Sequence, residues 1–284
     1  MKKKIGFIDY YISEWHANNY PAWIQDANKA LGVDYEVAYV WAEHDISPVN
    51  GETTAQWCGR MGATPCATLA ELCEKSDVLL ILAPSNPEKH LAYAKQALTY
   101  GKPTYIDKTF APDYSTAAEI FRIARDHHTP FFSSSALRYA EELAELTDAQ
   151  NIILTGGGSN LNEYIIHLVE MAVTLLQDPA DAVQVMHLGN QRLCSVETRN
   201  HKKAVLLYSP ALPFAATAEN SQGIASHYKI TSPFFAHLLE DILRFYESEK
   251  TSFDVQETLE VMRIRDGILK ADTQPGTSIT LNEI

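Results

Sequence analysis

The chain has 284 residues, which is long enough for two domains or one large one. Its hydrophobic share of 46% and charged share of 21% are those of an ordinary globular protein. The formal net charge of −13 argues against nucleic acid or an anionic membrane as a partner. It says little about small substrates, because a local basic site can lie in an acidic protein.

The start of the chain and its cysteines favour a cytoplasmic protein. Asp9 interrupts the apolar run that follows the opening lysines, so the run is too short for a signal peptide. No stretch reaches the apolar length of a membrane span. The four cysteines show neither C-x-x-C spacing nor a disulfide framework, so we expect free thiols in a reducing compartment.

Strands and helices alternate over the first part of the chain. The predicted strands are 4–8, 35–41, 77–82, 103–106 and 130–133. The predicted helices are 15–31, 53–61, 69–75, 87–100 and 114–127. This alternation predicts an α/β fold with a Rossmann-like, doubly wound parallel sheet over residues 1–137. Right-handed crossovers then place the loops that follow the strands at one edge of the sheet.

The second half has a different rhythm, which predicts a C-terminal α+β domain over 138–284 built on an open, mostly antiparallel sheet. The predicted strands are 151–154, 182–188, 191–198, 204–208, 214–219 and 225–230. The predicted helices are 161–176, 233–248 and 255–271. We expect the glycines at 156–158 to form a flexible link and the polar tail from Asp272 to be extended.

Lys108 stands at the end of a predicted strand in the segment GKPTYIDKTFAP, residues 101–112. Ligands of an open α/β sheet bind outside the carboxyl ends of the strands, so this lysine is a candidate for chemistry. The alternative is an ordinary solvated lysine at a strand end.

The first strand-to-helix turn, DYYISE at 9–14, lacks the glycines of a dinucleotide-binding loop. Tyr10 and Tyr11 would crowd the space that the phosphates need, and Asp9 and Glu14 would repel a dianionic pyrophosphate. Ser13 could still cap the following helix. The tyrosines could instead offer stacking and hydroxyl contacts to a sugar-like ligand.

Several segments resemble, in the same order, those of the glucose–fructose oxidoreductase / inositol dehydrogenase (Gfo/Idh/MocA) family. APSNPEKHLAYAKQALTYGKPTYIDKTFAP is similar to a family segment with a Thr-Pro loop, a helix histidine, Gly-Lys and Glu-Lys-Pro. The counterparts here are Ala83-Pro84, His90, Gly101-Lys102 and Asp107-Lys108-Thr109. SSALRYAEEL supplies Arg138 for the family's arginine at the domain junction, and NEYIIHLVEM resembles its Asp-x-Gly-x-His helix.

The resemblance implies an NAD(P)-dependent oxidoreductase that acts on a sugar, polyol or related hydroxyl compound. The implied catalytic residues are Lys108, His167 and Glu163. The implied residues for NAD or NADP are Ile8, Asp9, Tyr10, Tyr11, Glu43, Ala83, Pro84, Asn86, Asp107 and Lys108. The implied substrate residues are Arg138, Tyr164 and His16.

In this picture His167 is the general base, because its pKa range suits proton transfer near neutral pH. Lys108 polarises the same substrate oxygen or keeps the imidazole uncharged by repulsion, and Glu163 orients the substrate or the imidazole. An ordinary amphipathic helix would show the same polar stripe of Glu163, His167, Glu170 and Thr174 on its solvated face.

Two other classes of function stay open. The fold could have lost dinucleotide binding and become a binding or regulatory protein, or it could serve a lyase or isomerase that uses Lys108 and His167. Histidines and acids do not show the spacing of a metal site, so no metal is expected. The resemblance also implies a homo-oligomer, a dimer or a tetramer.

Overall fold

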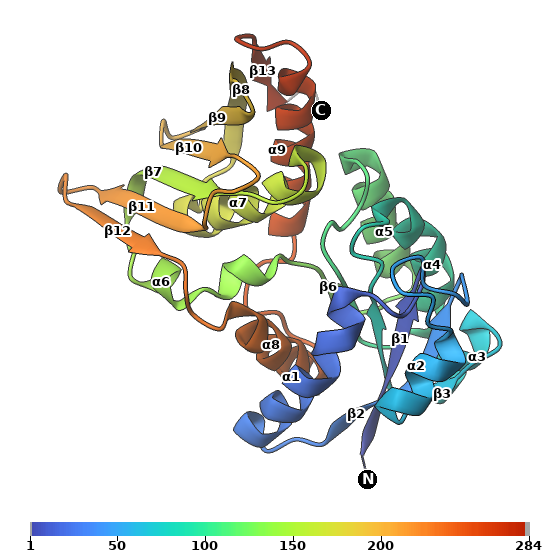
Figure 1. The fold of residues 1–284 in the computed structure, drawn as a ribbon. Coiled ribbons are helices and arrows are strands. Elements are labelled where there is room, and N and C mark those ends of the chain that lie inside the picture. The colour runs from blue at the N-terminus through green and yellow to red at the C-terminus, as the bar shows by residue number, and fades with distance from the viewer. Residues whose placement is uncertain (1, 282–284) are drawn as a thin grey trace. The chain divides into compact units, whose positions relative to one another are not determined.

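The computed structural model describes residues 2–281, which form two compact units. The first unit comprises the chain up to Ser134 together with Phe235–Val255, and the second comprises Ser135–Phe234 and the segment from Gln256 onward. The sequence pattern predicts one division of the chain, after residue 137, whereas in the structure 235–255 belongs to the first unit (Figure 1).

The first unit is built on a parallel sheet in the order β3-β2-β1-β4-β5-β6, as predicted for a doubly wound domain. Its strands are β1 Lys3–Asp9, β2 Tyr35–Ala42, β3 Thr64–Pro65, β4 Val78–Ile81, β5 Thr104–Ile106 and β6 Phe131–Phe132. The short β3 was not predicted. It pairs with β2 through Tyr39 and Val40, and it is too short to show a periodic pattern.

The helices of this unit follow the predicted ranges closely. They are α1 Trp15–Leu31, α2 Thr54–Met61, α3 Leu69–Lys75, η1 Pro87–Lys89, α4 His90–Ala97, η2 Leu98–Tyr100, α5 Tyr114–Asp126 and α8 Phe234–Ser248. Gly32 ends α1 in the left-handed conformation with φ 69°, as its position after the helix predicts. Thr53 caps α2 in a capping box with Gln56.

Strand β1 is buried on both faces, which explains its apolar sequence. On one face Phe7 meets Trp57 of α2, with ring centroids 6.4 Å apart. On the other face α3 comes so close that a Cβ on Gly6 would lie 2.4 Å from Ser76 Oγ. Only glycine fits at this position.

Helix α8 packs beside α1 in the first unit (Figure 1). The ring of Phe235 stacks on Trp23 of α1 at 5.1 Å, and the Tyr246 hydroxyl donates to the Leu79 carbonyl of β4 at 2.7 Å. The helix thus contributes to the core beneath the sheet although it lies late in the chain.

The second unit contains a mixed sheet in the order β12-β11-β7-β10-β9-β8-β13. Its strands are β7 Ala149–Gly156, β8 Ala180–Leu188, β9 Gln191–Thr198, β10 Lys203–Tyr208, β11 Ala215–Asn220, β12 Ala225–Lys229 and β13 Ser278–Thr280. The pairing is antiparallel except between β7 and β10. The tail predicted to be extended forms β13 beside β8, and positions 282–284 of that prediction lie outside the described residues.

Helices α7 Leu161–Leu176 and α9 Glu257–Asp272 pack on this sheet, and two short elements precede it, η3 Ala136–Tyr139 and α6 Glu141–Ala144. The glycines expected to form a flexible link are tightly packed instead. A Cβ on Gly157 would lie 1.7 Å from the Ser209 carbonyl oxygen, and one on Gly158 would lie 2.0 Å from the Tyr164 ring. Because they have no side chain, these glycines let the end of β10 and the Tyr164 ring of α7 lie directly against the backbone of this segment.

Candidate active site

The carboxyl ends of β1, β4 and β5 bring together several residues predicted to bind a cofactor. The Asp9 carboxylate at the end of β1 accepts hydrogen bonds through Oδ1 from the backbone amides of Tyr10, at 2.7 Å, and Ala83, at 3.0 Å. Asp107 follows β5, and its amide donates to the Ile81 carbonyl of β4 at 2.8 Å. Ile8 itself is buried within β1.

Glu14, and not Ser13 as expected, caps helix α1. Its carboxylate accepts from the amides of His16, at 2.7 Å, and Ala17. The side chain is buried, and burial raises the pKa of the Glu14 carboxyl although His16 and these amides oppose the rise. The prediction for Ser13 is wrong because that hydroxyl is used by a residue far away in the sequence.

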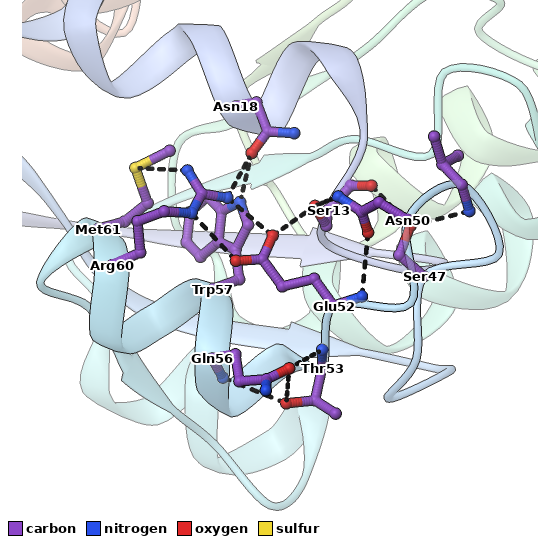
Figure 2. Close-up of polar contacts among 11 residues, drawn as sticks. Ser13, Asn18, Ser47, Asn50, Glu52, Thr53, Gln56, Trp57, Arg60 and Met61 are labelled. Atoms are coloured by element: carbon purple, nitrogen blue, oxygen red, sulfur yellow. Dashed lines mark hydrogen bonds and ion pairs between the residues drawn. The ribbon is translucent and has the colours of Figure 1, made fainter.

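Ser13 belongs to a polar network that fixes the β1–α1 turn against the segment before α2 (Figure 2). Its hydroxyl donates to Glu52 at 2.6 Å and accepts from Asn50 at 2.9 Å. Arg60 of α2 pairs with Glu52 at 2.8 Å and reaches Asn18 of α1 at 2.9 Å. The turn is therefore held in place by side chains from three elements.

The start of α1 does not fit a dinucleotide pyrophosphate in the standard position. That position requires free amides at the helix N-terminus and a glycine turn that lets the backbone approach the phosphates. Here the amides of His16 and Ala17 already bind the Glu14 carboxylate, and the Tyr10 amide binds Asp9. The same amides cannot also hold a phosphate.

His16 and Asp107 form a buried pair at this edge. Nδ1 of His16 contacts Oδ2 of Asp107, and the two side chains are 8% and 1% exposed. Burial alone would raise the pKa of Asp107, but the charge and hydrogen bond of His16, with Lys108 nearby, bring it below its ordinary value. The Lys108 amide also donates to Asp107 Oδ1, at 2.9 Å.

Lys108 lies beside this pair, as its strand-end position predicts. Its ammonium group is 3.4 Å from the Pro84 carbonyl oxygen, and the Lys108–Thr109 peptide bond is cis. Two buried polar atoms at this edge, Asp9 Oδ2 and Thr109 Oγ1, have no hydrogen-bond partner within the described residues. Burial and the charge of Glu14 raise the pKa of Asp9 well above its usual range.

Glu43, after β2, is tied to helix α4 and is not a solvated loop acid. It accepts from Lys89 at 2.6 Å and from the Tyr93 hydroxyl at 2.8 Å, and these partners lower its pKa. Beside it lies a pocket of about 480 Å³ lined by Tyr10, Tyr11, His44, Asp45, Ile46 and Pro48. Asn86 bonds with Glu88 at 3.0 Å.

The second unit holds the other predicted residues on and around α7. His167 Nδ1 is 2.6 Å from the Ser135 hydroxyl, and the Tyr164 ring lies 5.7 Å from the imidazole. Arg138 binds Glu170 at 2.5 Å and Glu257 at 2.8 Å. Glu163 is half-buried, and its amide binds the Asn160 cap at 2.9 Å.

The polar stripe of α7 is not a solvated face at its centre, because His167 is 9% and Glu170 3% exposed. Burial raises the pKa of Glu170, and the Arg138 charge opposes the rise. The catalytic and substrate roles assigned to these residues stay predictions.

Three partners of the predicted site residues were not predicted. The hydroxyl groups of Tyr20 and Tyr105 each donate to Asp107 Oδ1 at 3.4 Å, and Ser135 bonds with His167. Tyr20 had a signal, since it follows His16 by one helical turn and therefore lies on the same face of α1. Ser135 and Tyr105 meet their partners only through the folding of the chain, because no local pattern marks them.

Comparison with solved structures gives the class of the fold. The chain is similar to a probable dehydrogenase from Thermotoga maritima, with TM-score 0.82 and 9% identity over 99% of both chains. It is similar to a myo-inositol dehydrogenase from Corynebacterium glutamicum, with TM-score 0.77 and 12% identity over 99% of both chains. It is also similar to GenD2 from gentamicin A biosynthesis, solved in complex with NAD. The TM-score is 0.79 and the identity 10%, over 98% of this chain and 96% of GenD2.

The chain therefore has the fold of oxidoreductases of the Gfo/Idh/MocA type, as the sequence resemblance implied. No family model matches the sequence, and no curated protein matches it. Within residues 2–281 no group of three or more His, Cys, Asp or Glu side chains is placed to hold a metal ion. In the same range no helix is long and apolar enough to cross a membrane.

Proposed function

We propose that the protein is an isomerase or lyase that acts on a sugar, polyol or related hydroxyl compound by proton transfer. The observation that carries this proposal is the Glu14 carboxylate on the first amides of α1. Where the fold would hold a pyrophosphate, this chain places its own anion. The substrate class is supported by the fold, which it shares with a myo-inositol dehydrogenase.

The proposed chemistry needs a group that stabilises negative charge on oxygen and a group that moves a proton. Lys108 is our candidate for the first task, since an ammonium group beside a carbonyl oxygen stabilises the enolate that forms when a neighbouring C–H loses its proton. In an isomerase the proton then returns to the adjacent carbon. In a lyase it is given to the β-hydroxyl group, which leaves as water. For the second task the resemblance implies His167, and that role stays a prediction.

The test is deuterium exchange into a panel of aldoses, ketoses, aldonic acids and inosose-type ketones in D₂O, followed by proton NMR. We expect exchange at a carbon next to a carbonyl group for at least one compound. Lys108→Ala should lower its rate by about 100-fold or more, in the range of lost oxyanion stabilisation. Lys95→Ala, which removes an exposed lysine of α4, should leave the rate unchanged.

The second candidate is the nicotinamide-dependent oxidoreductase of the same fold. It is favoured by the full-length likeness to a probable dehydrogenase and to GenD2, which was solved in complex with NAD. Titration with NADH and NADPH, read by fluorescence and thermal shift, separates the two candidates. Binding of either nucleotide would overturn the proposed isomerase or lyase in favour of the oxidoreductase. Absence of both nucleotide binding and deuterium exchange would leave a binding or regulatory protein.

We also propose that the protein lies in the cytoplasm and forms a homo-oligomer. The cytoplasm is supported by the four cysteines, all of which are buried free thiols. Self-association is supported by apolar side chains on the outer face of the mixed sheet, such as Ile153 at 50% and Met186 at 44% exposed.

A further inference from the structure

We propose that His16 is an acid–base residue of this site and that Asp107 positions its imidazole, leaving Nε2 to exchange a proton with the substrate. This inference rests on the proposed function and adds a residue to it. The sequence resemblance gives His16 only a substrate contact and Asp107 only a cofactor contact.

The first support is the hydrogen-bond pattern of the imidazole. Nδ1 contacts the Asp107 carboxylate, whereas Nε2 has no hydrogen-bond partner among the described residues. An ionised carboxylate only accepts, so Nδ1 carries the hydrogen and the lone pair of the neutral ring lies on Nε2. A ring held in this way by a carboxylate is oriented for general-base catalysis through its other nitrogen.

A second histidine of the same unit shows what a purely structural imidazole looks like here. Both ring nitrogens of His90 face backbone carbonyl oxygens, Leu82 at 2.5 Å and Phe110 at 2.9 Å, and the side chain is fully buried. His90 therefore has no nitrogen left for a ligand. His16 differs because one nitrogen is fixed and the other is not.

The ring of His16 is also held rigidly. It stacks on Tyr20 with centroids 5.2 Å apart and planes 11° apart. Trp15 and Phe235 pack against it edge-on, at 5.2 Å and 5.8 Å. Such packing keeps the imidazole in one orientation, which a proton-transfer group requires.

Ionisable side chains surround the ring and can support the uptake and return of a proton. The carboxyl groups of Asp107 and Glu14 face His16, and Tyr20 stacks on the ring. Lys108, the next residue in the chain, helps to lower the pKa of Asp107. Nε2 takes a proton from a substrate C–H or O–H group, and the Asp107 carboxylate stabilises the imidazolium that forms. The imidazolium then gives the same proton to the neighbouring carbon or to a leaving hydroxyl group. Asp107 stays ionised throughout, because His16 holds its pKa low.

The first arm of the test needs no substrate. Nitrogen-15 NMR of the histidine rings over a pH series gives the tautomer of His16 where the ring is neutral, and it should show the hydrogen on Nδ1 and none on Nε2. Asp107→Asn should populate the neutral tautomer with hydrogen on Nε2, because an amide side chain can donate to Nδ1 whereas a carboxylate only accepts, and Asp107→Glu should restore the wild-type tautomer. A neutral wild-type ring with hydrogen on Nε2, or a tautomer that Asp107→Asn leaves unchanged, would overturn the assignment of Asp107.

The second arm uses the compound that shows deuterium exchange. His16→Asn and His16→Gln should slow the exchange by about 100- to 10,000-fold, the usual contribution of a general base. His127→Gln, which changes an exposed histidine at the end of α5, is the matched control and should exchange at the wild-type rate. Folding of each variant is checked by its thermal transition, and exchange at the wild-type rate in a folded His16 variant would overturn the role.

The two arms separate this inference from the proposed function. A wild-type protein without exchange contradicts the proposed function, while the ring tautomer still decides whether Asp107 positions His16. Exchange in the wild type that survives in the His16 variants contradicts the inference alone.

Discussion

Asp9 is a buried carboxyl group with one oxygen in use and one without a partner. Oδ1 holds the amides of Tyr10 and Ala83 and so joins the ends of β1 and β4. Oδ2 is buried and has no hydrogen-bond partner in the described part of the chain. Burial and the charge of Glu14 together raise the pKa of this carboxyl group well above its ordinary value of 3.8.

The raised pKa predicts a definite pH dependence of stability. The folded state binds the Asp9 proton more tightly than the unfolded state, so this group destabilises the fold increasingly as the pH rises above 3.8. Asp9→Asn should remove that dependence, because the amide carries no charge and its Oδ1 can still accept both backbone hydrogen bonds. At neutral pH we expect the variant to be more stable than the wild type, because the buried negative charge is gone.

Urea unfolding of the wild type and of Asp9→Asn between pH 4 and pH 8 measures this difference, with pH 4 chosen as about the ordinary pKa of the carboxyl group. The gain should be smallest at the acid end and grow with pH. Asp26→Asn, which changes an exposed carboxylate of α1, provides the control and should shift stability little at any pH. A variant that is less stable than the wild type at neutral pH would show that the Asp9 charge supports the fold.

At the scale of the elements, one guanidinium joins three of them in the second unit. Arg138 of η3 binds Glu170 of α7 and Glu257 of α9, at 2.5 Å and 2.8 Å. The side chains of Arg138 and Glu170 are 7% and 4% exposed, so water screens their attraction weakly. Removing one member of such a pair leaves an uncompensated buried charge.

Arg138→Met should therefore destabilise the protein by about 3–5 kcal/mol, the usual cost of breaking a buried ion pair. The surface pair of Arg122 with Glu119 and Asp126 on α5 supplies a matched control. Arg122→Met should change the stability little, because exposed ion pairs contribute little. Denaturant unfolding followed by circular dichroism compares the two variants, and equal effects would contradict the structural role of Arg138.

Most elements could be predicted from the sequence because each has a local signal. The apolar run of β4, the Thr68 cap of α3 and the Gly32 end of α1 are marked within a few residues. The topology rule for parallel strands then places Asp9, Asp107 and Lys108 at one edge. This part of the candidate site needs no knowledge of side-chain contacts.

What could not be predicted depends on partners that are distant in the sequence. Ser13 is a good cap by residue type, but Glu52 and Asn50 bind its hydroxyl, and Glu14 takes its place. The burial of the polar stripe on α7 likewise depends on η3, which supplies partners for His167 and Glu170. A helix pattern alone cannot distinguish solvent from such partners.

At the scale of the whole molecule, the same fold is kept with very few identical residues. Identity to the three similar solved structures is 9–12%, although the alignment covers 96–99% of the chains. The fold requires a pattern of apolar strands, helix ends and close-packed glycines, which many sequences satisfy. The β1–α1 turn is not required by the fold, so it can change its chemistry without loss of the architecture.

In the described residues, helices cover only one face of the mixed sheet. We predict that the other face is the surface through which subunits associate. Along β7 the side chains of Ile152 and Leu154 are buried, whereas Ile153 points to the opposite side and is 50% exposed. Its neighbours across the pairing are Val205 of β10 and Thr217 of β11. An apolar surface of this kind on a sheet face is typical of an interface between subunits.

We therefore expect the wild type to form a dimer or tetramer through this face and Ile153→Lys to be a monomer, because the ammonium group would have to be buried without a partner. Light scattering coupled to size-exclusion chromatography gives the mass of each. Ile224→Lys is the control, since Ile224 is equally exposed, at 57%, but lies in the turn between β11 and β12 beyond the paired strands. It should keep the wild-type mass. A monomeric wild type at all concentrations would contradict self-association, and an oligomeric Ile153→Lys would place the interface elsewhere on the chain.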